Sequence, residues 1–273
     1  MLTVSALTYY PVKGFAGVSV DRADVVDTGL ADDRLLMVVD AGDGRFLSQR
    51  VLPAMAAVRP ALADGGLRLS APGAQDAEVE IARDGPRRPV SLFDRWFGEA
   101  VDQGDAAAKW CSEVLDRDVR LVRVTPEHDR DGWGEHPGKV GFGDAHAILL
   151  TSPASLDGLN ERIRARGAEP VPMNRFRPNI VVDGWSEPHT EDRVLRLSAG
   201  TVVLGHSARA IRCAVPTVDQ ETGAKRGPEP TRTLAGYRRE PDFGGGVSFG
   251  AKLAVLTPGA LSVGDEITVE DWL

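Results

Sequence analysis

The sequence predicts a mainly β protein with a few helices, of the α+β class. Short runs rich in Val, Leu and Tyr recur along the chain and are bounded by Gly, Pro and Asp, a composition typical of strands and turns. Only two segments show the 3.6-residue apolar spacing of a buried helix face. Many short strands with Gly- and Pro-containing turns favour a sandwich or barrel over a parallel sheet covered by helices. The length of 273 residues suits one large or two modest domains.

Apolar runs predict a series of strands over the first ninety residues. The segment Asp40–Gly44 lies between two runs and is typical of a hairpin loop, because glycine adopts positive φ without strain. The predicted strands are Leu2–Tyr9, Val18–Val26, Leu35–Asp40, Leu67–Ser70, Glu78–Ala82 and Pro89–Phe93.

Two helices are expected next. The first covers Ala106–Leu115, with Asp105 as its cap and Cys111 on its buried face. The second begins at Ser152 and Pro153, a capping residue followed by the proline that first turns favour.

The rest of the chain again has the pattern of strands. Val194–Leu197 and Thr201–Leu204 are expected to form a hairpin, and the other predicted strands are Asn179–Val182, Val255–Thr257 and Glu266–Val269. The Gly- and Pro-rich stretch Thr125–Gly143 interrupts regular structure. We therefore predict a domain boundary near residue 124, with domains at 1–124 and 125–273.

Composition excludes several classes of protein. With 32 basic and 40 acidic side chains the net charge is 32 − 40 = −8, which argues against nucleic-acid and anionic-membrane partners. No run of 18 apolar residues predicts a membrane span, and no basic segment precedes an apolar one at the N-terminus. We expect a cytoplasmic protein. Cys111 and Cys213 are too few for an iron–sulfur cluster or a four-thiolate zinc site, and they form no disulfide framework.

Common catalytic motifs are also absent from the sequence. The segment Gly205–Arg209 approaches the nucleophile elbow G-x-S-x-G, but Arg209 replaces its last glycine. The run Gly244–Gly246 lacks the strand and helix that a dinucleotide fingerprint needs. The histidines do not have the spacing of a zinc site.

One cysteine is a candidate reactive group. Cys213 follows Arg212 directly and lies four residues after Arg209. Neighbouring guanidinium charge favours the thiolate, which is a nucleophile and a ligand for soft metals. The alternative is a small buried side chain, because free cysteine is among the most buried residue types.

A pair of arginines is the second candidate. Arg175 and Arg177 flank Phe176 in the segment Met173–Asn179. On a strand the two guanidinium groups would point the same way and could bind a phosphate or another oxyanion. The alternative, two solvated surface arginines, stays open. Lys13 and Arg34 lie at strand ends, where each taken alone is typical of a surface charge.

Four segments together resemble a known family. They are Pro11–Gly14, Asp33-Arg34, Arg175–Asn179, and Cys213 with the following Thr217–Gly223. The chain is similar to MOSC proteins with an N-terminal MOSC β-barrel domain, the group of the mitochondrial amidoxime reducing component and its bacterial relatives. The resemblance implies a β-barrel MOSC domain and a smaller N-terminal β domain.

The resemblance also implies a molybdenum cofactor, the molybdenum–molybdopterin group. Cys213 stands where the family's thiolate binds molybdenum, and sulfur suits a metal that changes oxidation state. Gly14 stands where many relatives have serine. The positions implied to hold the cofactor are Lys13, Gly14, Arg34, Asp144, Ala145, His146, Arg175, Arg177 and Arg212.

The activity implied is that of a molybdenum-dependent oxidoreductase, reducing N-hydroxylated or N-oxide compounds by oxygen-atom transfer. Asp219 is expected to assist proton handling or to hold its loop. A separate flavin or iron–sulfur protein must supply electrons, because the chain has no dinucleotide fingerprint and too few cysteines for a cluster. Two alternatives remain. In the first, the chain is a non-catalytic carrier of the cofactor or of a persulfide on Cys213. In the second, it is an interaction module without cofactor.

Overall fold

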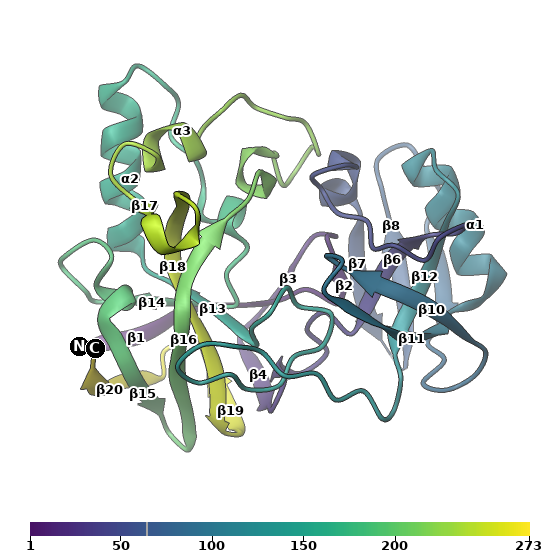
Figure 1. Ribbon diagram of the computed structural model, residues 1–273, viewed down its shortest axis with the longest axis horizontal. Coiled ribbons are helices and arrows are strands. Elements are labelled where there is room, and N and C mark those ends of the chain that lie inside the picture. The colour runs from purple at the N-terminus through teal and green to yellow at the C-terminus, as the bar shows by residue number, and fades with distance from the viewer. Residues whose placement is uncertain (64) are drawn as a thin grey trace.

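The computed structural model describes residues 1–63 and 65–273, which form two lobes (Figure 1). The first lobe contains a β-barrel of seven strands. The ring closes because β13 pairs with β14 on one side and with β18 on the other. In ring order the strands are β13 (Ile148–Thr151), β14 (Ile180–Asp183), β1 (Leu2–Tyr9), β20 (Glu266–Trp272), β15 (Val194–Ala199), β16 (Val202–Arg212) and β18 (Gly246–Thr257).

Apolar side chains from alternate strand positions fill the barrel. Leu7, Leu150, Leu204 and Leu253 are each at most 1% exposed and belong to one core cluster. Alternation puts every second residue of a strand on the inner face, so the period-2 pattern of the sequence specifies this core. Of the neighbouring pairs in the ring only β13–β14 is parallel. The fold class predicted from the sequence is confirmed.

The second lobe contains two smaller sheets and a helix. The helix α1 (Gly104–Leu115) packs on β9 and β12 through its apolar face. One sheet has the order β10 (Arg87–Leu92), β11 (Trp96–Asp102), β12 (Val119–Val124), β6 (Leu36–Asp40) and β2 (Val12–Lys13). The other consists of β7 (Arg59–Ala63), β8 (Gly66–Ser70) and β9 (Ala77–Glu80).

Short elements complete the structure. The strands β4 (Arg22–Val26), β5 (Gly29–Leu30) and β19 (Gly259–Ser262) form a small sheet, while β3 (Val18–Val20) pairs with β1 and β17 (Arg239–Glu240) with β18. The other α-helices are α2 (Pro153–Ala165) and α3 (Thr231–Leu234). The 3-10 helices are η1 (Pro53–Ala57), η2 (Met173–Phe176), η3 (Thr190–Arg193), η4 (Val215–Thr217) and η5 (Pro241–Phe243). Among the described residues no helix is long and apolar enough to cross a membrane.

The two predicted helices are present, but one cap was predicted wrongly. Ser152 caps α2 as expected, since its hydroxyl accepts a hydrogen bond from the Ser155 amide at 3.2 Å. Asp105 does not cap α1, because the helix begins at Gly104, two residues before the predicted start at Ala106. There the Asp102 carboxylate accepts the Gly104 amide hydrogen bond at 2.8 Å, which leaves Asp105 in the first turn.

The predicted strands differ from the structure mainly in length. β1 has the predicted limits, whereas Val18–Val26 is divided into β3 and β4 by a bend at Asp21. Only the end of β18 was predicted. The strands without a predicted counterpart are β2, β5, β7, β11, β12, β13, β17 and β19. The stretch Thr125–Gly143 contains no named strand or helix, as expected.

Strand pairing joins the two ends of the chain. β1 pairs with β14 and β20, so the first strand belongs to a barrel built otherwise from residues after 147. The chain then passes into the second lobe at β2 (Figure 1). The division at residue 124 stays a prediction, and strand pairs cross it.

Removing apolar volume from the barrel tests this core. Leu204 on β16 is 1% exposed and Leu256 on β18 is 39% exposed. We expect Leu204→Ala to lower the free energy of unfolding by about 2–5 kcal/mol, because it leaves a cavity. The control Leu256→Ala should cost less than about 1 kcal/mol. Urea unfolding measures both, and equal losses would contradict the assignment of Leu204 to the barrel core.

Candidate active site

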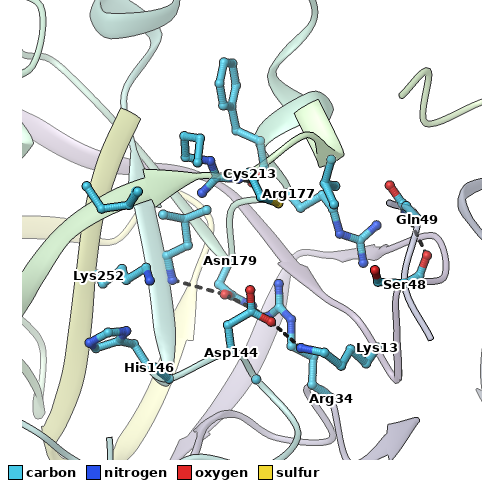
Figure 2. A pocket seen from close by; sticks show the side chains of 18 of the residues that line it. Lys13, Arg34, Ser48, Gln49, Asp144, His146, Arg177, Asn179, Cys213 and Lys252 are labelled. Carbon is cyan, nitrogen blue, oxygen red and sulfur yellow. Dashed lines mark hydrogen bonds and ion pairs between the residues drawn. The ribbon is translucent and has the colours of Figure 1, made fainter. Parts of the chain in front are cut away.

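A cavity of about 140 Å³ lies where the two lobes meet (Figure 2). The second lobe contributes β2 and the loop after β6, which carries Ser48, Gln49 and Arg50. The barrel lobe contributes the loop before β13, the residues after η2, the end of β16 and Lys252 of β18. Neither lobe alone encloses the space.

Cys213 directly follows β16, one of the two long strands that border the cavity. β16 ends at Arg212, and two residues after Cys213 the chain enters the 3-10 helix η4. The Cys213 side chain is exposed, whereas Cys111 is fully buried in the second lobe. Burial raises the pKa of Cys111 to about 12, so that thiol stays protonated. Of the two cysteines, Cys213 is therefore the one available to a ligand.

Positive charge dominates the cavity wall. Asp144 is the one acidic side chain among the described residues that line it. This excess of positive charge belongs to a chain with net charge −8, so the cations are concentrated here. The cationic lining residues are Lys13, Arg34, Arg50, Arg177, Arg212 and Lys252.

A buried tyrosine and a buried carboxylate position two of these cations. The guanidinium carbons of Arg34 and Arg177 lie 4.5 and 4.2 Å from the centroid of the Tyr10 ring. Arg34 forms an ion pair with Asp33, which is 4% exposed, and donates to Asn179 Oδ1 at 3.2 Å. Both arginines have a left-handed backbone, with φ of 51° and 57°, so each sits in a sharp turn.

A second ion pair crosses the cavity between the lobes. Lys13 of β2 and Asp144 point toward each other and are in contact (Figure 2). Burial lowers the pKa of Lys13, although Asp144 opposes that shift. Desolvation by the surrounding protein raises the pKa of the Asp144 carboxyl. The nearby cations, Lys13 first and then Lys252 and Arg50, outweigh that effect, and the pKa is lowered.

Arg212 has unused hydrogen-bonding capacity. Its Nη2 donates to the Phe176 carbonyl at 2.7 Å, and its buried Nε has no hydrogen-bond partner among the described residues. Burial lowers the pKa of Arg212, with the neighbouring Cys213 side chain opposing that shift. A buried donor without a partner is costly, so the site favours an acceptor that comes from a ligand.

His146 is neutral in this environment. Burial, followed by the charge of Lys252, lowers its pKa to about 3. Its Nε2 lies 2.9 Å from the Trp133 carbonyl, an acceptor that fixes the proton on Nε2. Nδ1 is then free of a proton and has no hydrogen-bond partner among the residues described, so it can accept from a ligand.

Two predicted site residues lie outside the cavity. Asp219 accepts the backbone amides of Glu221 and Thr222, both at 3.0 Å, and it holds the loop. Arg175 donates to the Pro216 carbonyl at 3.0 Å and faces Asp219 at 3.8 Å. Neither lines the cavity. The structure brings together the others, namely Cys213, Lys13, Gly14, Arg34, Asp144, Ala145, His146, Arg177 and Arg212.

Sequence reasoning missed several lining residues. Lys252 was detectable, because it is a lone cation in the apolar run of β18. Asn179 lay inside a segment already singled out, but its role needs the contact with Arg34. Gln49 and Arg50 reach the cavity from a loop whose sequence carries no signal.

The residues present fit an anionic, phosphate-bearing group with a soft metal centre. The cation excess and the free Arg212 Nε match phosphate oxygens, and an exposed thiol matches a soft metal. Within residues 1–63 and 65–273 no cluster of three or more His, Cys, Asp or Glu side chains could hold a metal ion by itself. A metal here would need ligands from the bound group as well as Cys213.

Comparisons with known proteins identify the family to which the chain is similar. The family model of the MOSC N-terminal beta barrel domain matches residues 1–118, and that of the MOSC domain matches residues 137–268. Mitochondrial amidoxime-reducing component 1 of Mus musculus is 31% identical, over 97% of this chain and 81% of its own. Mitochondrial amidoxime reducing component 2 of Bos taurus is 32% identical, over 97% and 82%. The molybdenum cofactor sulfurase of Arabidopsis thaliana is 28% identical, over 86% of this chain and 31% of its own.

The neutral state of His146 can be measured directly. A folded-state pKa of about 3 against an ordinary 6.5 means that only the unfolded chain takes up this proton as the pH falls below 6.5. We therefore expect the NMR signals of the His146 ring to stay constant between about pH 8 and pH 5. The free energy of unfolding should decrease as the pH is lowered from 8 to 5, and this decrease should be smaller in His146→Gln. A ring that titrates near pH 6.5 would contradict the burial argument.

Proposed function

The chain belongs to the MOSC family, in the group where a MOSC N-terminal β-barrel domain precedes the MOSC domain, and on this premise we propose that it is a molybdenum-cofactor-dependent reductase. One observation carries the proposal: the exposed Cys213 thiol opens on a cavity walled by arginine and lysine side chains. A thiolate is a soft metal ligand, and guanidinium groups bind phosphate oxygens.

Different residues of the cavity would hold different portions of the cofactor. Cys213 would bind the metal, and the bound group would supply two-electron redox chemistry at a soft centre. Arg34, Arg177 and Arg212 would hold the anionic portion with charge-assisted hydrogen bonds. Tyr10 and Asp33 lie behind two of these arginines, so the positive wall exists before the ligand arrives.

The reaction proposed is the reduction of N-hydroxylated or N-oxide compounds. For an N-hydroxy group the N–O bond breaks, two electrons and two protons are taken up, and the products are the N–H compound and water. The two electrons would come from a separate flavin or iron–sulfur protein. The names of the amidoxime-reducing relatives support this choice.

Lys252 is the side chain best suited to deliver a proton. Burial lowers the pKa of Lys252, and Arg212 adds to the shift while Asp144 opposes it. An ammonium group with a lowered pKa gives up a proton more readily to a departing oxygen. Asp219 is bound within its own loop and does not face the cavity, so we assign it no part in the reaction.

A second function is supported by one comparison. The similarity to a molybdenum cofactor sulfurase, together with the exposed thiol, fits a carrier that holds sulfur as a persulfide on Cys213. Such a carrier would gain the mass of one sulfur atom at Cys213 without metal. A reductase would contain stoichiometric molybdenum and would reduce N-hydroxy compounds with an artificial electron donor. A bare interaction module would do neither.

Replacing the thiol tests the ligand assignment. Protein from a host with an intact cofactor pathway should lose both bound molybdenum and amidoxime reduction in Cys213→Ser, because a hydroxyl replaces a soft thiolate poorly. Metal analysis and a reductase assay with a reduced dye measure these losses. The matched control Cys111→Ala should retain activity, since Cys111 lies in a separate core. Unchanged turnover in Cys213→Ser would refute the assignment.

Removing one arginine tests the anionic part of the site. Arg177 is 8% exposed, and a charge-assisted hydrogen bond to phosphate is worth about 1.5–3 kcal/mol. We expect Arg177→Ala to weaken cofactor retention by roughly 10- to 150-fold. The control is Arg164→Ala on α2, which does not line the cavity. The molybdenum-to-protein ratio after extended dialysis gives the answer, and equal ratios would exclude Arg177 as a contact.

A further inference from the structure

A second, larger hollow adjoins the cavity. This groove has a volume of about 750 Å³ and shares six lining residues with the cavity, among them Arg50, Asp144 and Lys252. A molecule lying in the groove would therefore reach the space in front of Cys213. The groove is large enough for an organic compound of moderate size.

Aromatic side chains from both lobes line the groove. Phe46 and Phe93 come from the second lobe, with ring centroids 4.3 Å apart. Trp133 comes from the long loop before β13 and is 42% exposed. Phe46 and Phe93 are half-buried, and together with the exposed Trp133 they offer flat apolar faces on which a planar ligand can stack.

An energetically costly turn holds Phe93 in place. Phe93 and Asp94 connect β10 to β11 with φ of 58° and 53°, a conformation that hairpins normally assign to Asn or Gly. The Asp94 carboxylate pairs with Arg45 at 2.9 Å, which stabilises the turn. Left-handed backbone at non-glycine residues persists where the surroundings enforce it, and such residues are concentrated at functional sites.

The charges of the groove are not balanced. Its acidic side chains are already paired, Asp94 with Arg45, Asp131 with Lys139, and Asp144 with Lys13.

Four groove cations have no ion-pair partner. Within residues 1–63 and 65–273 they are Arg50, Arg95, Arg130 and Lys252, of which Arg130 donates to the backbone carbonyls of Gly141 and Gly143. Two of them lie near aromatic rings, the Arg50 guanidinium carbon 4.9 Å from the Phe93 centroid and Lys252 Nζ 6.0 Å from the Trp133 centroid. The groove therefore presents net positive charge beside its aromatic rings.

We propose that this groove binds the substrate and selects planar aromatic N-hydroxy compounds that are neutral or acidic over those that are cationic. Stacking on Phe93 and Trp133 holds the aromatic body, and Arg50 and Arg95 attract an acidic substituent remote from the N–O group. The same charges repel a cation. The chemical step rests on the function proposed above, but recognition by the groove does not.

Binding of matched probes tests the charge preference. The probes are three aromatic amidoximes whose para substituent is carboxylate, methyl or trimethylammonium. Calorimetric titration of the holoprotein without electron donor gives the dissociation constants. We expect the carboxylate probe to bind about tenfold more tightly than the trimethylammonium probe, with the methyl probe between them.

Variants of residues that line the groove but not the cavity locate the binding site. Trp133→Ala should weaken all three probes about equally, because it removes stacking. Arg95→Glu should weaken the carboxylate probe, strengthen the trimethylammonium probe and leave the methyl probe unchanged. The controls are Trp272→Ala, an exposed tryptophan elsewhere, and Arg164→Glu, which makes the same charge change outside the groove.

The outcomes separate the groove from the reaction. Equal affinities for the three probes, or effects of the control variants as large as those of Trp133→Ala and Arg95→Glu, would overturn the groove as the selective site. Probes bound in the expected order but never reduced would leave the groove intact and overturn the reductase function. Probes that are reduced but bind without charge preference would support the reductase function and overturn the groove as the selective site.

Discussion

The buried carboxylate of Asp33 is the constraint on which the site depends. It accepts hydrogen bonds from the Tyr10 amide at 2.8 Å and Asn179 Nδ2 at 3.0 Å, and it pairs with Arg34. A buried charge is tolerated only when it is paired and hydrogen-bonded, so these groups must keep their places together. Because Tyr10 lies between β1 and β2 while Asn179 precedes β14, one carboxylate fixes the junction of the two lobes.

The cations gathered around this junction are costly without a ligand. Burial lowers the pKa of Arg177 to about 10 and also that of Arg212, which means that the folded protein disfavours their charges. Asp144 offsets part of this charge through Lys13, but the wall keeps a positive excess. An anionic ligand would relieve the repulsion. The arrangement is thus better suited to binding an anion than to stabilising the fold.

The sequence was sufficient to predict those strands and site residues that a short segment of the chain specifies by itself. Arg177 and Cys213 lie in short segments that the sequence singles out as candidate sites, and β1 follows from its apolar run. Arg34 became a candidate only through the family resemblance. Gln49 and Arg50 could not be placed, because they join the site through contacts between residues far apart in the chain. Asp105 failed as a cap for a local reason: Asp102 reaches the first free amide instead. The pairing of strands around the barrel, which assigns β1 to its lobe, likewise cannot be predicted from any short segment of the sequence.

The position of the cavity between the lobes would separate the proposed chemistry from the proposed selection of substrate. Cys213, Arg212 and Lys252 belong to barrel strands or directly follow one, and seven paired strands hold those positions rigid. Phe46 and Phe93 belong to loops of the second lobe, where substitution disturbs few backbone hydrogen bonds. Loop changes can therefore alter the shape and charge of the groove while the thiol and its cations keep their geometry. On the proposed function, this arrangement would let the substrate change without rebuilding the site proposed for the cofactor.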